Sequence, residues 1–430
     1  MRFTYLPHTL LTILTLLAAW GLVRDGINTH KGGAIDLRNR LTGTRIAQAD
    51  KDPFLYKWEQ GEPAVFCDPF NLKTWPLSKT TVTPVALAVN LPYSGLNYKP
   101  IQWLWFLIQY GVLALGCLAW CQGSSRSNLF WGLGWTLLFC CSAAWRLHVD
   151  RGQIYVVYAG LLLLLVALSR HSTWWKSLIE GTAGGLLMGL RPTFISHFAV
   201  PAAERRWLAT GTSLATLAAM VGLPMLLFGG DIWTQYKSAM DEHARLYLEQ
   251  VPPTSAPMSF PANVENMPFD ELAGFARTIP FADTSIHKLT SFAFSNGVTK
   301  SILAMWALLM FCSGIYLMCK HPNNTNLLWW AITAWLLLGD YLLPAYRNIY
   351  NDALAWPMLL MGLTALRDRP RLIWIGLGTT LLLLQIAVWQ MPKGFIGIPS
   401  YGALILASAT IVWTFKVQNG SVVESPSTDS

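Results

Sequence analysis

The chain is organised around the stretch GAIDLRNR at residues 33–40, which follows the first apolar segment of the sequence. Asp36 is an acidic residue shortly after a segment long enough to cross a membrane. A polar segment rich in aromatic residues, 49–58, precedes the next apolar run. Ionisable groups at a membrane edge are costly to keep there, which makes them functional candidates. We therefore expect Asp36 to be the chemical centre of the protein.

The composition is that of a membrane protein. Of the 430 residues, 53% are hydrophobic and only 13% are charged, whereas soluble domains contain about 25% charged residues. The 21 Trp and 14 Tyr residues gather near the ends of apolar segments, as interfacial anchors do. The formal net charge of +8 is scattered over short loops, so it favours orientation in membrane lipids over a nucleic-acid partner.

Apolar segments recur along the chain at lengths that suit a bilayer of about 30 Å. In lipid a backbone must satisfy its own hydrogen bonds, so these segments are expected to be helical. The fold class predicted is an all-α polytopic membrane protein with about twelve spans. The segments fall at 8–23, 100–121, 127–145, 152–169, 177–190, 193–203, 207–228, 300–319, 326–344, 352–366, 371–389 and 397–415, with 177–203 either one broken helix or two.

Two long polar segments, about 24–99 and 229–299, interrupt this series. We expect a single transmembrane catalytic domain over 1–416 and a Ser-rich, disordered cytoplasmic tail over 417–430. The N-terminal apolar segment carries no convincing cleavage site, so we interpret it as an uncleaved helix.

Orientation follows from the basic residues of the short loops. Cytoplasmic loops are enriched in Lys and Arg. If both termini are cytoplasmic, every such loop obeys this rule, and both long segments lie outside the cytoplasm of a plasma (inner) membrane. The residues are Arg126, Arg170, Lys176, Arg205, Arg206, Lys320, Arg367, Arg369, Arg371 and Lys416.

Four arginines break this pattern, because they fall on the side where arginine is rare. They are Arg146, Arg151, Arg191 and Arg347, accompanied by Asp150, Gln153, Asp340, Asn348, Asn351 and Asp352. One interpretation is that each arginine pairs with a neighbouring aspartate or a lipid headgroup. The other is that the four together make an anion site beside the long loops.

The long segments themselves carry local structure. Residues 35–48 have the spacing of a short amphipathic helix on the membrane surface. Asp52-Pro53 marks a turn, and 83–92 is apolar but too short to span, as in an interfacial or re-entrant segment. The Pro-rich stretch 251–261 is expected to belong to a lid over a site.

Several motifs, taken in this order, resemble glycosyltransferase family 87. They are Asp36-Leu37-Arg38, Asp52-Pro53-Phe54, Thr83-Pro84 leading to Leu91-Pro92-Tyr93, Gly152-Gln153, and Leu190-Arg191-Pro192-Thr193. Each is common by itself, and their order over roughly 8–230 carries the resemblance.

The resemblance implies a C-type glycosyltransferase fold, a polyprenyl-phosphate sugar donor and an active site on the extracytoplasmic face. It implies an inverting hexosyl- or pentosyltransferase of the cell envelope, mannosyltransferase-like, with an acid of the first outer loop as base. Asp36 matches that position. The family often has a His between late helices, but residues 346–352 contain none, which leaves the second catalytic partner and the sugar open.

The chemistry assigns further roles. Transfer of a sugar to a hydroxyl of a lipid or glycan acceptor needs a base and groups that stabilise the leaving phosphate. Asp36 is the candidate base. Arginine binds phosphate oxygens through a planar fork, so the candidate phosphate ligands are Arg191 and Arg347, then Arg146 and Arg151. The substrate-orienting candidates are Arg38, Gln153, Asn351, Asp352, Asp52 and His148, the last also an alternative base.

Other interpretations stay open from the residues alone. Asp36 could cap the amphipathic helix or pair with Arg40, and Asp52 could serve a turn, the acceptor or a metal. No cofactor is certain, and a divalent metal is left open, although no His/Cys/Asp cluster has metal-ligand spacing. A polytopic transporter or lipid flippase, and an oligosaccharide polymerase or ligase, are the competing functions.

Overall fold

The computed structural model is helical throughout the part of the chain that it describes. Every regular element there is an α-helix or a 3-10 helix. The described residues are 6–31, 33–71, 75–122, 126–170, 173–249, 325–342, 347–366, 371–387 and 398–420, with 285, 305, 308, 312 and 316. The expected span at 300–319, the Pro-rich stretch 251–261 and the tail from 421 fall outside them.

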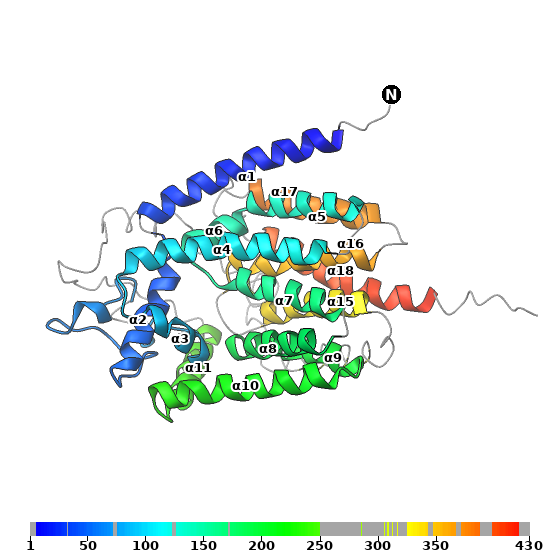
Figure 1. Cartoon of the computed structure of the whole chain (residues 1–430). Coiled ribbons are helices and arrows are strands. Elements are labelled where there is room, and N and C mark those ends of the chain that lie inside the picture. The colour runs from blue at the N-terminus through cyan, green and yellow to red at the C-terminus, as the bar shows by residue number, and fades with distance from the viewer. Residues whose placement is uncertain are drawn as a thin grey trace, which may run out of the picture.

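Most helices run side by side as a bundle (Figure 1). They are α1 (Leu6–Lys31), α4 (Tyr98–Cys121), α5 (Arg126–Cys140), α7 (Tyr155–Ser169), α8 (Trp174–Leu190), α10 (Trp207–Phe228), α15 (Thr325–Leu342), α16 (Ala355–Ala365), α17 (Arg371–Ala387) and α18 (Ile398–Gly420). The disordered tail expected from 417 therefore begins inside α18.

Nine further helices are described outside this set. At one end of the bundle, left in Figure 1, lie α2 (Ile35–Gln48), α3 (Pro84–Asn90) and α11 (Ile232–Leu248); we call this the α2 end. The others are α6 (Ala143–Arg151), α9 (Ala199–Ala203), η1 (Ala64–Phe66), η2 (Leu91–Tyr93), η3 (Pro192–Phe198) and η4 (Ile349–Leu354).

Three described helices, α1, α4 and α10, are long and apolar enough to cross a membrane. The pair α6 and α7, bent by 114°, would make a fourth span if counted as one. These helices indicate a membrane protein, but the expected twelve spans are not confirmed. The segment 193–203 is not a separate span, because it forms η3 and the five-residue α9. Arg191 is extended, as a residue before proline tends to be, and this ends α8 before Pro192.

Large aromatic side chains fill the centre of the bundle. Trp120, Trp145, Trp329, Trp356 and others are fully buried there. A buried indole needs a partner for its N–H, and three of these tryptophans have one. Trp145 donates to the Tyr110 hydroxyl at 3.2 Å. Trp356 donates to Thr136 Oγ1 at 3.0 Å, and Trp329 donates to the Ser169 hydroxyl at 3.0 Å. The aromatic packing and these bonds hold α5, α7, α15 and α16 in register.

Helix α2 has the bounds that its spacing predicts, Ile35–Gln48, but it does not lie on a surface with one face in water. Leu37 and Leu41 pack with Tyr98, and Arg38 and Arg40 on other faces are buried as well. The cause is that neighbouring segments bind α2 on several sides. Thr44 donates to the Leu87 carbonyl of α3, and the Asn39 carbonyl accepts from Thr80. Arg45, on the side expected to face solvent, donates to the carbonyls of Ser94 and Leu96. The helix is therefore enclosed between the loops and the bundle.

Gly152, between α6 and α7, makes the sharp turn of this pair possible. Its φ of +64° is left-handed, and a Cβ there would lie 2.7 Å from Ala34 Cβ and 2.8 Å from Ala34 Cα. A side chain would therefore strain the turn and push away the segment that leads into α2.

We predict that Gly152→Ala lowers the stability of the folded protein by at least about 1 kcal/mol, the cost of left-handed backbone for an L-residue. The matched control is Gly134→Ala in α5, where a Cβ would meet nothing within 4 Å. Thermal unfolding in detergent measures both. Equal midpoints for the two variants would contradict the assigned role of Gly152.

Candidate active site

Asp36 lies in the first turn of α2 and is held by two residues from the α6–α7 turn. Arg151 donates from Nε to Asp36 Oδ2 at 2.9 Å and from Nη2 to Asp36 Oδ1 at 2.8 Å. Gln153 donates from Nε2 to Oδ2 of the same carboxylate. The Asp36 side chain is 14% exposed. This is a two-point, charge-assisted pair, the stronger class of ion pair in proteins.

The two other structural roles considered for Asp36 are wrong. The residue at the N-cap of α2 is Ala34, and no side chain caps the helix there. Arg40 donates instead to the carbonyl of Gly152 and stacks over Trp105 at 5.5 Å. Asp36 is therefore paired across the fold with Arg151, over 115 residues of sequence.

The Gly152-Gln153 motif explains how this pair is positioned. The Ala34 N–H donates to the Asp150 carbonyl at 2.6 Å, which joins the start of α2 to the end of α6. The Gln153 N–H returns to the His148 carbonyl at 2.9 Å and tightens the turn. With Gly152 left-handed between them, Arg151 and Gln153 both reach Asp36.

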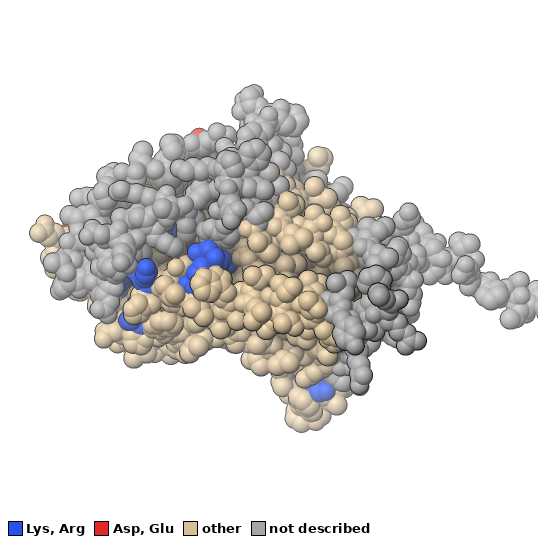
Figure 2. All heavy atoms as spheres, turned by 90° about the horizontal axis from the view of Figure 1, so that it is seen from above, with Lys and Arg blue, Asp and Glu red and all other residues tan. Residues whose placement is uncertain are grey.

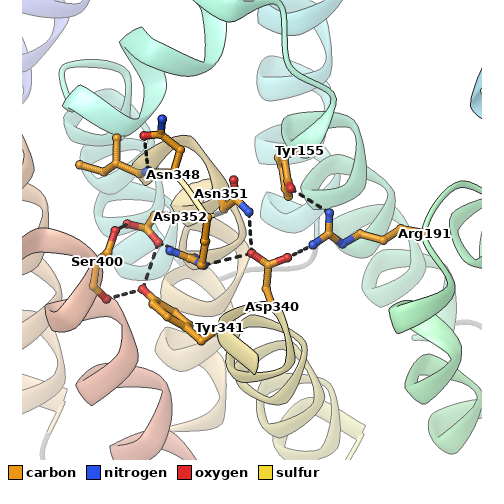
Figure 3. Close-up of polar contacts among 10 residues, drawn as sticks. Tyr155, Arg191, Asp340, Tyr341, Asn348, Asn351, Asp352 and Ser400 are labelled. Carbon is orange, nitrogen blue, oxygen red and sulfur yellow. Dashed lines mark hydrogen bonds and ion pairs between the residues drawn. The ribbon is translucent and has the colours of Figure 1, made fainter. Parts of the chain in front are cut away.

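A second polar cluster, formed by α15, η4 and the end of α8, surrounds Arg347 and Asp340 (Figure 3). Arg347 donates from Nη2 to Asp352 at 2.7 Å and from Nε to Asp340 at 3.1 Å. Asn351 donates to Asp340 at 2.8 Å, and Arg191 pairs with the other Asp340 oxygen. The predicted Arg191 and Arg347 therefore lie in one cluster, but both are bound to Asp340.

Asp352 and Arg347 are internal to this cluster. Asp352 accepts hydrogen bonds from Ser400 at 2.7 Å and from Tyr341 at 3.2 Å in addition to Arg347. Asp352 is 0% exposed and Arg347 is 1% exposed. A buried charge with its hydrogen bonds satisfied acts as a structural link, because breaking the pair would leave its partner unpaired. Arg191 is different, since it also donates to the Tyr155 hydroxyl of α7 at 2.8 Å.

Two tyrosines connect the clusters of Asp36 and Arg191. The rings of Tyr155 and Tyr350 lie 5.9 Å apart. Tyr350 is within electrostatic reach of Asp36, Arg151 and Arg191. The candidate base and one predicted phosphate ligand therefore lie near the same pair of tyrosines, Tyr155 and Tyr350, which we call the aromatic floor.

The motif Thr83-Pro84 also has a place in this arrangement. The Thr83 hydroxyl donates to the Leu190 carbonyl at 3.2 Å, so the start of α3 holds the end of α8. Arg191 follows immediately. The Thr83-Pro84 motif and the Leu190-Arg191 motif, far apart in the sequence, thus together position Arg191.

Three other predicted site residues lie away from Asp36. Arg146 pairs with Asp150 at 3.8 Å, and Asn28 of α1 donates to Asp150 at 3.2 Å. His148 is fully buried, and its Nε2 accepts the Val156 N–H at 3.0 Å at the start of α7. Asp52 accepts the Phe54 N–H at 2.8 Å and so forms the turn. His148 is thus engaged with the backbone and is not positioned as a base.

Sequence reasoning missed Asp68, a buried acid in the first long loop. Its carboxylate accepts the Phe70 N–H at 3.0 Å. With its amide turned to satisfy both groups, Asn39 donates to the two Asp68 oxygens at 2.5 and 3.2 Å. Burial raises the pKa of Asp68 to about 6, although Arg38 and Lys79 oppose the rise. The only signal in the sequence was an Asp-Pro pair, which also reads as a turn.

Arg38 reaches Asp68 rather than Asp36. Its guanidinium lies over the Tyr98 ring at 4.4 Å and interacts with the Asp68 charge. Over the described ranges, no group of three or more His, Cys, Asp or Glu side chains is arranged to hold a metal ion. The arrangement as a whole offers a carboxylate, several cations and aromatic faces, as base-assisted transfer from an anionic leaving group requires.

Comparison with protein-family models matches residues 81–275 to Glycosyltransferase family 87, which confirms the resemblance drawn from the motifs. The match includes Arg151, Gly152, Gln153 and Arg191, and it begins after α2. Comparisons with curated proteins and with solved structures give no match.

We predict that Asp68→Asn stabilises the folded protein at about pH 7.5, by at most roughly 3 kcal/mol, the equivalent of raising a pKa from 3.8 to about 6. The pKa of Asp68 is higher in the folded than in the unfolded protein. Burial of the ionised carboxylate therefore destabilises the fold fully above about pH 6, and this destabilisation disappears as the pH falls toward 4. The gain should shrink over that window.

Thermal unfolding midpoints at a series of pH values measure this difference, with exposed Asp241→Asn of α11 as control. A gain that is independent of pH, or a loss of stability at neutral pH, would contradict the burial of an ionised Asp68.

Proposed function

Because residues 81–275 match the model of glycosyltransferase family 87, we propose that the protein moves a sugar from a polyprenyl-phosphate donor to a hydroxyl of a lipid or glycan acceptor. The reaction takes place at the α2 end of the bundle, with Asp36 as general base. The observation that carries this proposal is the Asp36 carboxylate, partly exposed and held by Arg151 and Gln153.

The proposed step is a single displacement with inversion. The acceptor hydroxyl gives its proton to Asp36 while its oxygen forms a bond to the anomeric carbon. The bond from that carbon to the phosphate oxygen breaks, and its electron pair leaves with the polyprenyl phosphate. General-base assistance of this kind typically contributes 10²–10⁴-fold in rate.

Arg151 and Gln153 have positioning roles in this proposal. The two-point pair holds the Asp36 carboxylate in one orientation. Gln153 holds one carboxylate oxygen, which leaves lone pairs on Asp36 for the acceptor. As the donor phosphate enters, Arg151 is close enough to Asp36 to share its guanidinium between the two anions.

The predicted phosphate ligands divide into two kinds. Arg151 and Arg191 border the aromatic floor formed by Tyr155 and Tyr350 and are the arginines we assign to the phosphate. Arg347 is bound within its cluster, and Arg146 is paired with Asp150. We assign these two arginines a structural role, in which their ion pairs join neighbouring segments.

The sidedness of the reaction rests on the basic loops of the sequence. With both termini cytoplasmic in the plasma (inner) membrane, the α2 end faces outward. A lipid-linked donor suits that face, since nucleotide sugars are made in the cytoplasm. The ionisable clusters at one end of the bundle favour this function over a transporter, for which a site at mid-membrane is expected.

We predict that Asp36→Asn lowers the rate of sugar transfer at least about 100-fold, because an amide cannot accept the acceptor proton. Membranes containing the full-length protein are given a labelled polyprenyl-phosphate sugar, and labelled product is measured. Asp241→Asn, an exposed change on α11, should transfer at the wild-type rate.

Unchanged transfer by Asp36→Asn would remove Asp36 from the mechanism. Absence of covalent product with a set of hexosyl and pentosyl donors, together with uptake of a sugar lipid into vesicles, would instead support a transporter or flippase. Products longer than one added sugar would indicate a polymerase or ligase.

A further inference from the structure

The charges around α2 do not balance. Among the described residues, two carboxylates interact there with five cations, so with all seven ionised the set has a charge of +3. The carboxylates are Asp36 and Asp68, and the cations are Arg38, Arg40, Lys57, Lys79 and Arg151. On the face drawn in Figure 2, most of the visible Lys and Arg side chains lie toward the left, the end at which α2 lies in Figure 1.

The two neighbouring clusters are neutral by the same count. Arg191 and Arg347 face Asp340 and Asp352. Arg24 and Arg146 face Asp25 and Asp150. Partly buried charge that is left uncompensated is costly, so the positive excess around α2 indicates a site for an anion. Among these three clusters, the one at α2 is the place for it.

Lys79 is the cation of the α2 set whose head group is not committed to a neighbour. Arg151 binds Asp36 at two points, and Arg40 binds the Gly152 carbonyl. Within the described part of the chain, the Lys79 ammonium forms neither a hydrogen bond nor an ion pair, yet it is within electrostatic reach of Asp68, Asp36 and Arg151. Burial lowers its pKa, which is the cost of holding the charge there.

The backbone on both sides of Lys79 is fixed. The Ser78 hydroxyl donates to the Pro53 carbonyl at 2.6 Å, and the Ser78 N–H donates to the Phe54 carbonyl at 2.7 Å. The Thr80 hydroxyl donates to the Asn39 carbonyl of α2 at 3.2 Å. Both flanking side chains are buried. These hydrogen bonds therefore fix the backbone at Lys79 and hold it against α2.

Helix α11 and the first loop bring two more groups to Lys79. His243 of α11 interacts with the Lys79 charge, and burial together with that charge lowers the His243 pKa, which favours the neutral ring. Lys57 also interacts with the Lys79 charge, and its ammonium donates to Asn71 and to the Leu77 carbonyl at 2.6 Å each. Lys79 therefore interacts with a second lysine and an imidazole as well as with Asp36 and Arg151.

We propose that Lys79 binds the phosphate group of a polyprenyl phosphate, with Arg151 as the second ligand, so that the phosphate lies beside Asp36. This inference rests on the proposed function, which supplies the lipid-linked phosphate. A dianionic phosphate would offset most of this positive charge. Lysine suits such a site because its ammonium is a compact charge with three donors, and Arg151 supplies the planar fork.

The test is direct binding of polyprenyl monophosphate, without sugar, to the full-length protein in detergent. Lys79→Met removes the charge at similar side-chain length and should weaken binding about 10-fold or more, as expected for loss of a charge-assisted contact. Lys79→Arg should restore most of the binding. The matched control is Lys237→Met on α11, a lysine whose side chain is 77% exposed, which should bind as the wild type does.

Two further probes separate the sources of a phosphate. Inorganic phosphate and vesicles of phosphatidylglycerol should each bind far more weakly than polyprenyl phosphate and should respond little to Lys79→Met. Equal binding of inorganic phosphate would overturn the lipid-linked assignment. Wild-type affinity for polyprenyl phosphate in a folded Lys79→Met protein would overturn the role of Lys79.

These outcomes are independent of sugar transfer. A wild-type protein that binds polyprenyl phosphate through Lys79 but transfers no sugar would refute the proposed function and leave the phosphate site in place. A folded Lys79→Met protein with wild-type binding and wild-type KM for the donor would refute the phosphate site and leave the transferase. Thermal unfolding of each variant confirms that the comparison is made between folded proteins.

Discussion

Asp36 and Arg151 form a two-point ion pair that joins the first turn of α2 to the end of α6. The pair exists because Gly152 turns the chain between α6 and α7 with a left-handed φ, and because the Ala34 N–H is bound to the Asp150 carbonyl. The same turn orients Gln153. A carboxylate held in this way is aimed without being buried, which is the condition for a general base that must meet an incoming hydroxyl.

The arginines of this region fall into two groups, according to whether an aspartate neutralises their charge. Arg347 and Arg146 are compensated by aspartates and hold helices together. Arg191 ends α8 and contacts the Tyr155 hydroxyl, between the compensated cluster and the aromatic floor. The uncompensated charge lies around α2, where Lys79 and Arg151 face the base. Excess positive charge therefore distinguishes the α2 site, and Arg191, although paired with Asp340, lies at its border next to Tyr350.

Much of this was accessible from the sequence, and the reasons for the rest are physical. Periodicity gave the bounds of α2, and ordered motifs gave the family. Burial of both faces of α2 could not be predicted, because it depends on loops packing back over the helix. The pairing of Asp36 with Arg151 spans 115 residues and leaves no local pattern. Asp68 and Lys79 lie in irregular backbone, where no period distinguishes a site residue from a turn residue. The number of spans could not be settled from the apolar runs alone, because the chain breaks at Pro192 and bends sharply at Gly152.

The account depends on a lipid-linked phosphate reaching the Asp36–Arg151 pair, and the most direct measurement is a cryo-electron microscopy structure of the full-length protein with polyprenyl monophosphate bound. We expect the phosphate within hydrogen-bond reach of Lys79 and Arg151, with the prenyl chain leaving along the bundle and an open path to the Asp36 carboxylate. A phosphate bound at Arg347, or at the opposite end of the bundle, would contradict the account.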